Sequence, residues 1–161
     1  PFSPVAERLA DLADRVLGVF REKLARQGVE VVVDVPAGLP DAWVDSFQIE
    51  QVFIEIISNA LESMPKGGTL SIAAGVTETP AGARLEVAVR DTGEGIPADA
   101  LGHVGEPFFT TKADGTGLGL AIAKRFVEQN EGALTVSSRE RTGTQMTIVL
   151  PIAAKGVAAE V

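Results

Sequence analysis

Apolar side chains recur every three or four residues in three stretches of the chain, the spacing of a helix with one buried face. The first helix is predicted over residues 4–25. The second is predicted to begin at Asp45 or Ser46, either of which can cap a helix, and to run to about Met64. The third is predicted over residues 116–130, with a buried face formed by Leu118, Ala121, Ile122 and Phe126.

Apolar and polar residues alternate in five other stretches, as in strands that bury one face. Pro80 and Gly82 predict a hairpin with a somewhat long loop over residues 79–83. Trp43 is expected in the core, and together with Val44 it forms a stretch long enough only for an edge pairing. The five predicted strands cover residues 29–35, 69–77, 84–90, 133–138 and 144–150.

Strands that keep one polar face favour a mostly antiparallel or mixed sheet with helices on one side. We therefore predict an α/β fold, a two-layer sandwich in which three helices cover a sheet of about five strands. No internal repeat or second domain is evident in the pattern. Residues 1–152 are accordingly predicted to form one domain, followed by a C-terminal tail at residues 153–161.

The composition of the chain excludes some kinds of chemistry and makes some kinds of partner less favourable. A formal net charge of −8 disfavours nucleic acid or an anionic membrane as the main partner, because both attract basic surfaces. The chain has no cysteine, which excludes thiol catalysis and thiolate metal sites. No apolar run approaches the ~20 residues of a membrane span, so we expect a soluble, cytoplasmic domain whose longer parent protein could be membrane-anchored.

Two glycine clusters carry the candidate chemistry. Gly93 and Gly95 follow Asp91, and residues 115–119 hold three more glycines at the start of the third predicted helix. A glycine-rich turn at a helix N-terminus presents free N–H groups and the positive end of the helix dipole to a phosphate. The second cluster is neither a Walker loop nor a Rossmann fingerprint, because no Gly-Lys-Ser/Thr follows it and no strand precedes it. A flexible loop with a helix cap is the alternative interpretation.

Asp91 and the second predicted helix supply polar side chains. At the end of a strand, Asp91 can accept a hydrogen bond from a purine amine, although a tight turn is the commoner meaning of Asp-x-Gly. Glu55 and Asn59 are four residues apart and therefore share one helix face. Asn59 offers an oxygen ligand for Mg²⁺ and Glu55 could serve as a general base, unless the pair forms only a solvated face.

The segment between the glycine clusters is predicted to form a lid. Lys112 can pair with a terminal phosphate or remain a solvated surface lysine. Phe108 and Phe109 are expected to anchor the lid in the core. His103, the only histidine, is expected at the surface without a catalytic role and without a carboxylate or second ligand beside it.

Together and in this order, the motifs resemble the catalytic ATP-binding domain of bacterial sensor histidine kinases. That domain belongs to the superfamily that includes gyrase B, Hsp90 and MutL. The likeness runs from about Val5 to Pro151, and Gly143-Thr144 matches the terminal Gly-Thr of the family. Four stretches resemble the family boxes: residues 55–60 the asparagine box, 91–96 the first glycine box, 106–112 the phenylalanine box of nitrogen-regulator-type kinases, and 115–120 the second glycine box.

The resemblance implies ATP and Mg²⁺ as cofactors. Asn59 would coordinate Mg²⁺ that bridges the ATP phosphates, and Asp91 would accept a hydrogen bond from the adenine amine, with Thr144 helping through water. Glu55 and Lys112 would be the catalytic residues. The other implied nucleotide contacts are Gly93, Gly95 and Ile96 at the base, and Thr111, Lys112, Gly115, Gly117, Leu118 and Gly119 at the phosphates.

The resemblance also implies partners. The γ-phosphoryl group would pass to a histidine on a separate dimerisation domain, in cis or in trans, and from there to the receiver domain of a response regulator. This chain departs from the family pattern in lacking that acceptor, since no histidine precedes the asparagine box.

A second departure leaves the reaction open. Glu55 stands where many sensor kinases carry asparagine, and the Glu-x-x-x-Asn pattern is shared with ATP-hydrolysing relatives. An ATP-driven conformational switch of the gyrase B and Hsp90 kind is therefore one alternative. A nucleotide-binding module without chemistry of its own is another, and a serine kinase of the anti-sigma type is a third.

Overall fold

The structure is a computed structural model that describes residues 1–104, 106 and 118–154. The helices are α1 (Leu9–Gln27), α2 (Ser46–Glu62), α3 (Ala98–Leu101) and α4 (Gly119–Gln129). The strands are β1 (Val5–Glu7), β2 (Val29–Asp34), β3 (Ala42–Val44), β4 (Gly68–Thr79), β5 (Gly82–Asp91), β6 (Ala133–Arg139) and β7 (Gly143–Leu150).

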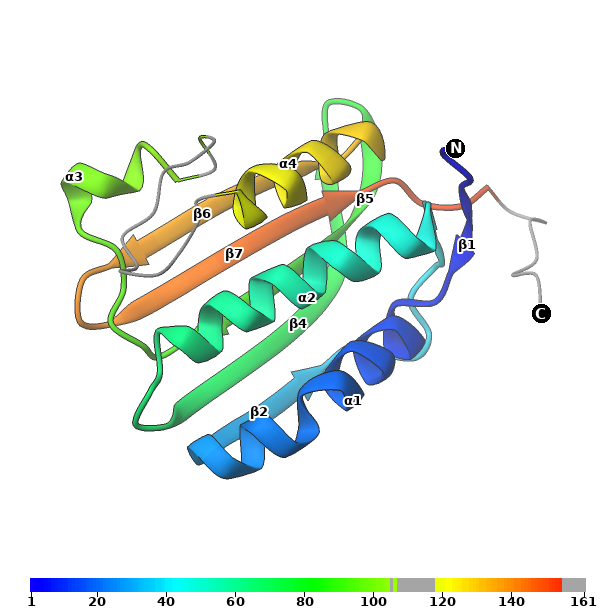
Figure 1. Cartoon of the computed structure of the whole chain (residues 1–161). Helices are drawn as coiled ribbons and strands as arrows, with labels where there is room; N and C mark the ends of the chain where they lie inside the picture. Colours follow the sequence, from blue (N-terminus) through cyan, green and yellow to red (C-terminus); the bar gives the residue numbers. More distant parts are fainter. Residues whose placement is uncertain (105, 107–117, 155–161) are drawn as a thin grey trace.

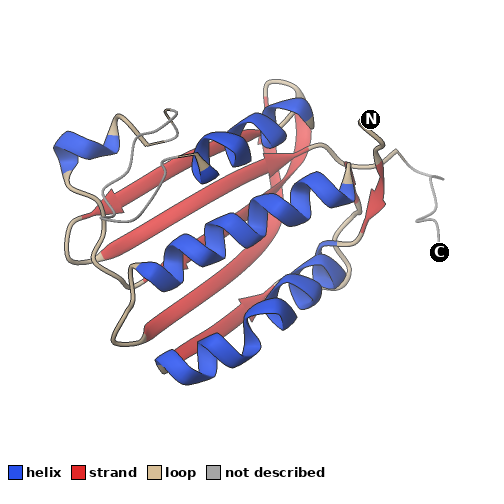
Figure 2. Cartoon of the chain, viewed as in Figure 1, coloured by secondary structure: helices blue, strands red, loops and turns tan. Residues whose placement is uncertain are grey.

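The main sheet has five strands in the order β2-β4-β5-β7-β6. Strand β2 runs parallel to β4, and the other neighbouring pairs are antiparallel. Helices α1, α2 and α4 lie side by side over one face of this sheet (Figures 1 and 2). The predicted two-layer sandwich is therefore confirmed, with the short helix α3 as an element that the sequence pattern did not predict.

The core fills the space between the helices and the sheet. Each of α1, α2, β4, β5 and β7 contributes side chains that are almost completely inaccessible to solvent, as the periodicities require. Among the described residues, no helix is both long enough and apolar enough to cross a membrane. The largest fully buried side chains include Leu12, Val16, Ile49, Ile56, Leu70, Leu85 and Ile148.

The start of the first helix was placed too early. Residues 5–7 form β1, which pairs antiparallel with β3, and α1 begins only at Leu9. Val5 lies four residues before Leu9 and so continued the helical spacing, but it pairs with Val44 instead. The predicted edge pairing of Trp43-Val44 is confirmed. Trp43 itself is 37% exposed, so its assignment to the core was wrong.

Two further expectations are corrected. The hairpin loop between β4 and β5 is short, because Thr79 pairs directly with Gly82. On α4 the buried residues are Ala123 and Val127, whereas Ile122 is 49% exposed. The helix carries two overlapping apolar sets, and the periodicity alone could not select the set that faces the sheet.

A buried polar network joins α2 to the end of α4. Asp45 caps α2 by accepting the Gln48 backbone N–H at 3.1 Å, and its second carboxylate oxygen accepts the Ser3 N–H at 2.9 Å. The Asn130 side chain, 1% exposed, accepts the Asp45 N–H at 2.8 Å. It also donates to the Phe126 carbonyl and to the Gln48 side chain, both at 2.8 Å.

We predict that Asn130→Ala lowers the free energy of unfolding by about 2 kcal/mol or more, because it leaves the buried Asp45 N–H without its acceptor. Urea denaturation followed by circular dichroism measures this change. Gln129→Ala is the matched control, since Gln129 is exposed and its side chain accepts one exposed hydrogen bond from Gln48. Equal losses in the two variants would contradict a special role for the buried amide.

Candidate functional site

Asp91 ends β5 and is only 6% exposed. Its Oδ1 accepts the Gly93 N–H at 2.9 Å and the Thr144 N–H at 3.3 Å. The first of these bonds closes an Asx-turn, so the tight-turn interpretation of Asp-x-Gly is correct as a description of the backbone. The second ties β5 to the start of β7, where Asp91 and Thr144 are paired. Neither bond uses Oδ2.

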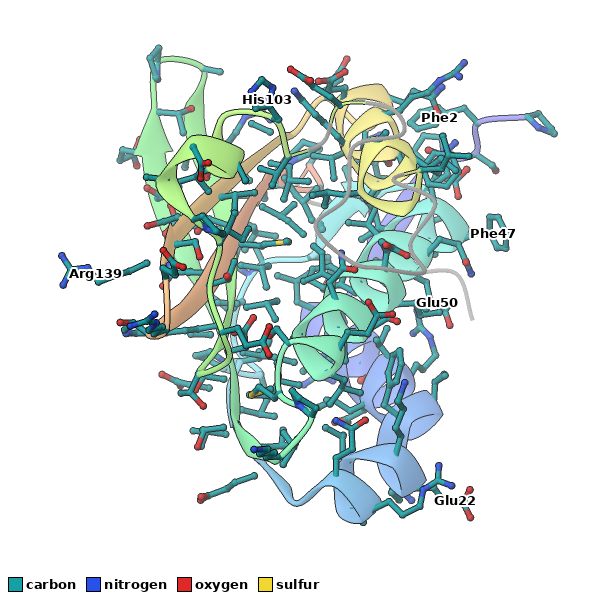
Figure 3. The ribbon with its side chains drawn as sticks, turned by 60° about the vertical axis from the view of Figure 1, so that its left-hand side comes forward. Phe2, Glu22, Phe47, Glu50, His103 and Arg139 are labelled. Carbon is teal, nitrogen blue, oxygen red and sulfur yellow. The ribbon has the colours of Figure 1, made fainter. Side chains whose placement is uncertain are left out.

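The two glycines after Asp91 are places where other backbone approaches closely. A Cβ on Gly93 would collide with the hydroxyl and the carbonyl of Ser63 at the end of α2. Gly95 has φ +70°, and a Cβ there would collide with the Arg139 carbonyl. The side chain of Arg139 extends away from the ribbon (Figure 3), so only its backbone meets the turn.

Ser138 on β6 connects the glycine turn to Thr144. Its hydroxyl accepts the Ile96 N–H at 2.8 Å and lies 2.7 Å from the Thr144 hydroxyl. It also donates to the Gly143 carbonyl at 3.0 Å. The structure therefore brings together Asp91, Ile96 and Thr144, all predicted for the base end of the site.

A polar ridge on α2 spans the distance from this turn to the start of α4. Glu55, Asn59 and Ser63 are spaced four residues apart and share one helix face. Ser63 lies against Gly93 at one end, and a Cβ on Gly119 would collide with the Glu55 carboxylate at the other. Asn59 lies between them on a ridge about 12 Å long, at 1.5 Å of rise per residue.

Helix α4 begins at Gly119, immediately after Leu118. Its N-terminus, which is the positive end of the helix dipole, is thus placed beside Glu55 at one end of the ridge. The other residues predicted around the phosphates, Thr111, Lys112, Gly115 and Gly117, lie outside the described residues, as do the predicted lid anchors Phe108 and Phe109.

His103 lies at the surface just after α3 (Figure 3), as predicted. The expectation that no carboxylate accompanies it was wrong, because its Nδ1 is 3.2 Å from a carboxylate oxygen of Glu106. Both side chains are more than half exposed, which identifies the contact as a surface pair.

Two residues of the site were missed from the sequence. Ser63 is separated from Asp91 by the whole of β4 and β5, and Ser138 lies on a different strand from Thr144. The one available signal for Ser63 was its position four residues after Asn59, which continues the Glu55–Asn59 ridge by one helical turn.

Burial dominates the electrostatics of Asp91. Desolvation raises the pKa of its carboxyl above the ordinary value, while hydrogen bonds from the Gly93 backbone, the Ser63 side chain and the Thr144 backbone act in the opposite direction. A buried carboxylate at the end of a strand, flanked by a glycine turn with no room for side chains, can present an acceptor to a flat ligand with an amino group. The α4 N-terminus can receive an anion at the opposite end of the same ridge.

Comparison with known proteins identifies the class. Residues 44–154 match the family described as histidine kinase-, DNA gyrase B-, and HSP90-like ATPase, and the chain belongs to this family. Within it, the chain is a catalytic ATP-binding domain of the sensor histidine kinase type, as the relatives below indicate.

The curated relatives are much longer than this chain. Sporulation kinase A of Bacillus subtilis is 46% identical over 107 residues, which are 66% of this chain and 17% of that protein. Sensor histidine kinase ZraS of Escherichia coli is 40% identical over 114 residues, 71% of this chain and 24% of ZraS. The chain thus spans about a quarter or less of the length of these relatives.

Solved structures agree with this assignment. The nucleotide-free catalytic domain of histidine kinase ThkA superimposes with a TM-score of 0.78 at 28% identity, covering 94% of this chain and 96% of that one. Full-length ShkA in complex with AMPPNP gives a TM-score of 0.82 at 26% identity, covering 99% of this chain and 33% of ShkA.

We predict that Asp91→Asn stabilises the fold at pH 7, because it removes a charge whose burial raises the pKa of the carboxyl. Because the pKa is raised in the folded state, the charged Asp91 carboxylate lowers the free energy of unfolding at every pH above that folded-state pKa. This destabilisation is lost as the pH falls through the folded-state pKa toward the ordinary value of about 4, because the carboxyl then becomes protonated. The advantage of Asp91→Asn in urea denaturation should therefore shrink between pH 7 and pH 4. Asp34→Asn, an exposed position on β2, is the control, and an Asp91→Asn advantage that does not vary with pH would refute the shift.

Proposed function

We propose that this domain binds Mg²⁺-ATP and transfers the γ-phosphoryl group to a histidine on a separate dimerisation domain. The histidine would then pass the group to an aspartate on the receiver domain of a response regulator. Family membership and an AMPPNP-bound structural relative support nucleotide binding. The observation that carries the proposal is the α2 ridge, because it joins a buried base acceptor to a helix N-terminus.

Asp91 would recognise the base. Its carboxylate is held in place by the Gly93 and Thr144 N–H groups, so it can accept from the exocyclic amine of adenine without first having to be ordered. Gly93, Gly95 and Ile96 would shape the wall of the base pocket. The Thr144 hydroxyl, placed by Ser138 at 2.7 Å, would take part through a water molecule.

The triphosphate would lie along α2 toward α4. Leu118 and Gly119 would contribute backbone N–H groups at the N-terminus of α4, and this helix is long enough for its dipole to attract phosphate. Gly115, Gly117, Thr111 and Lys112 would contribute from the segment before α4.

Asn59 would hold Mg²⁺ through its amide oxygen. The residue is half-buried near the middle of the ridge, and a single amide oxygen suits a cation that keeps most of its shell as water and phosphate oxygens. When bound, the ion would supply charge neutralisation at the phosphates. Positioning and charge compensation would then account for most of the catalysis.

Glu55 would act on the nucleophile. Its carboxylate contacts the first turn of α4, where the terminal phosphate would lie, so it is placed to accept a proton from an attacking group. The same placement suits activation of water, which keeps ATP hydrolysis as the second candidate. Incubation with Mg²⁺-ATP and a purified helical hairpin bearing the acceptor histidine separates the two. Acid-labile phosphate on the histidine supports transfer, whereas release of inorganic phosphate alone supports hydrolysis.

We predict that Asn59→Ala abolishes the Mg²⁺-dependent part of ATP affinity and stops transfer, because the amide is the proposed protein ligand of the ion. Isothermal titration calorimetry with and without Mg²⁺ measures the affinity. Gln51→Ala is the control, since Gln51 is exposed on the same helix two turns earlier. Unchanged Mg²⁺-ATP affinity and activity in Asn59→Ala would refute the metal assignment.

We predict that Gly119→Ala slows transfer toward the rate of Glu55→Gln, about 100-fold below the native protein, because the new Cβ occupies the position of the Glu55 carboxylate. Folding should not suffer, since alanine favours a helix and the displaced group is the end of a flexible side chain. Gly18→Ala on α1 makes the same change where nothing lies within 4 Å. A transfer rate in Gly119→Ala equal to that of the native protein would show that the position of the Glu55 carboxylate does not matter for phosphoryl transfer.

A further inference from the structure

Ser138 on β6 uses every hydrogen-bonding position of its hydroxyl. A serine hydroxyl donates one hydrogen bond and can accept two. The Ser138 hydroxyl donates to the Gly143 carbonyl at 3.0 Å and accepts the Ile96 N–H at 2.8 Å. Its third partner is the Thr144 hydroxyl, at 2.7 Å. Because the one Ser138 proton lies toward Gly143, Thr144 is the donor in this pair, and all three positions are filled.

The same pairing fixes the side chain of Thr144. This residue is 7% exposed and lies on β7 directly opposite Asp91 on β5. The bond to Ser138 is the one hydrogen bond of the Thr144 hydroxyl among the residues that the structure describes. With its proton directed at Ser138, the Thr144 oxygen presents only lone pairs to its other neighbours. Asp91 and Thr144 therefore offer a ligand two neighbouring acceptors.

Three other hydrogen bonds hold the glycine turn at residues 93–96 in place. They are the Glu94 N–H to the Ser63 carbonyl, the Arg141 N–H to the Glu94 carbonyl, and the Gly93 N–H to Asp91 Oδ1. Because none of them involves the Ser138 side chain, loss of its hydroxyl leaves the turn attached to α2, to the loop between β6 and β7, and to β5. The effect of that loss should therefore fall on Thr144.

We propose that Ser138 is a positioning residue that favours a 6-amino purine in this site, because it holds the Thr144 hydroxyl as a fixed acceptor beside Asp91. A water molecule that donates one proton to the Thr144 oxygen keeps its second proton for the base. The N1 atom of a 6-amino purine can accept that proton, whereas the N1 atom of a 6-oxo purine carries a hydrogen. This role rests on the proposed function, since it needs the base to lie against Asp91 and Thr144.

The test compares ATP with inosine triphosphate, which carries an oxo group in place of the 6-amino group. Calorimetry with Mg²⁺ present measures both affinities. Ser138→Ala should weaken ATP binding by about threefold to tenfold. The lower value applies if Thr144 occupies the required one of three staggered rotamers about a third of the time, and the upper value is about the size of one lost hydrogen bond. The affinity for inosine triphosphate should stay within about twofold, because its 6-oxo group cannot donate to Asp91 and gains nothing from an ordered Thr144.

A double-mutant cycle shows whether Ser138 acts through Thr144. Thr144→Val removes the hydroxyl and should weaken ATP binding at least as much as Ser138→Ala does. In the Thr144→Val protein, Ser138→Ala should have a further effect of less than about twofold, because no hydroxyl is left to hold. Ser138→Thr keeps the hydroxyl and should retain most of the preference for ATP. Ser137→Ala removes an exposed hydroxyl on the same strand and should change neither affinity.

The outcomes separate this role from the proposed function. If the native protein binds the two nucleotides equally, or binds neither, recognition of the base at Asp91 is wrong, and the role of Ser138 is wrong with it. If the native protein prefers ATP and Ser138→Ala keeps the native ATP affinity, the base recognition stands and only the role of Ser138 is overturned. Equal weakening of both nucleotides, or a full effect of Ser138→Ala in the Thr144→Val protein, would also overturn it. So would a native ATP affinity in Thr144→Val, which tests the role even if Ser138→Ala folds poorly.

Discussion

A buried carboxylate at the end of β5 is the constraint on which the site depends. Asp91 accepts N–H groups from its own glycine turn and from the start of β7, and the same turn is attached to the end of α2 through the Glu94 N–H. These bonds fix the corner at which the sheet and the helical layer meet. Because a buried carboxylate without hydrogen bonds is costly, Asp91 can stay buried and charged only while these N–H donors remain in place. The geometry of the site is thus maintained by the same bonds that make the charge tolerable.

Helix α2 extends the candidate site from this corner to the start of α4. Glu55, Asn59 and Ser63 occupy one face of α2, and the ends of the ridge are defined by contacts with Gly119 and Gly93. Both contacts exist only because glycine carries no Cβ at those positions. The glycines therefore determine how closely α2 approaches the base turn and the start of α4, in addition to leaving room for a ligand. This explains how motifs far apart in the sequence converge on one helix.

Much of the fold followed from periodicity, because each main helix and each strand of the large sheet buries one face. The errors arose where periodicity was ambiguous. Val5 continued the stripe of α1 yet pairs with Val44, and Ile122 was grouped with the buried face of α4 although it is half exposed. For the site, Asp91 and Thr144 could be predicted from motifs. Ser63 and Ser138 could not, because their contacts in the candidate site form only after distant strands and helices are packed together.

The network around Asp45 and Asn130 has a consequence for how the domain responds to motion at its beginning. Ser3 donates to the carboxylate that caps α2, and the Asn130 amide joins the same cap to the end of α4. The first residues are further held by the pairing of β1 with β3. Because these hydrogen bonds connect the first residues to the start of α2 and to the end of α4, we expect a rotation of the first residues to move both helices together. The two helices that frame the site would tilt together with any rigid body attached to this end of the domain.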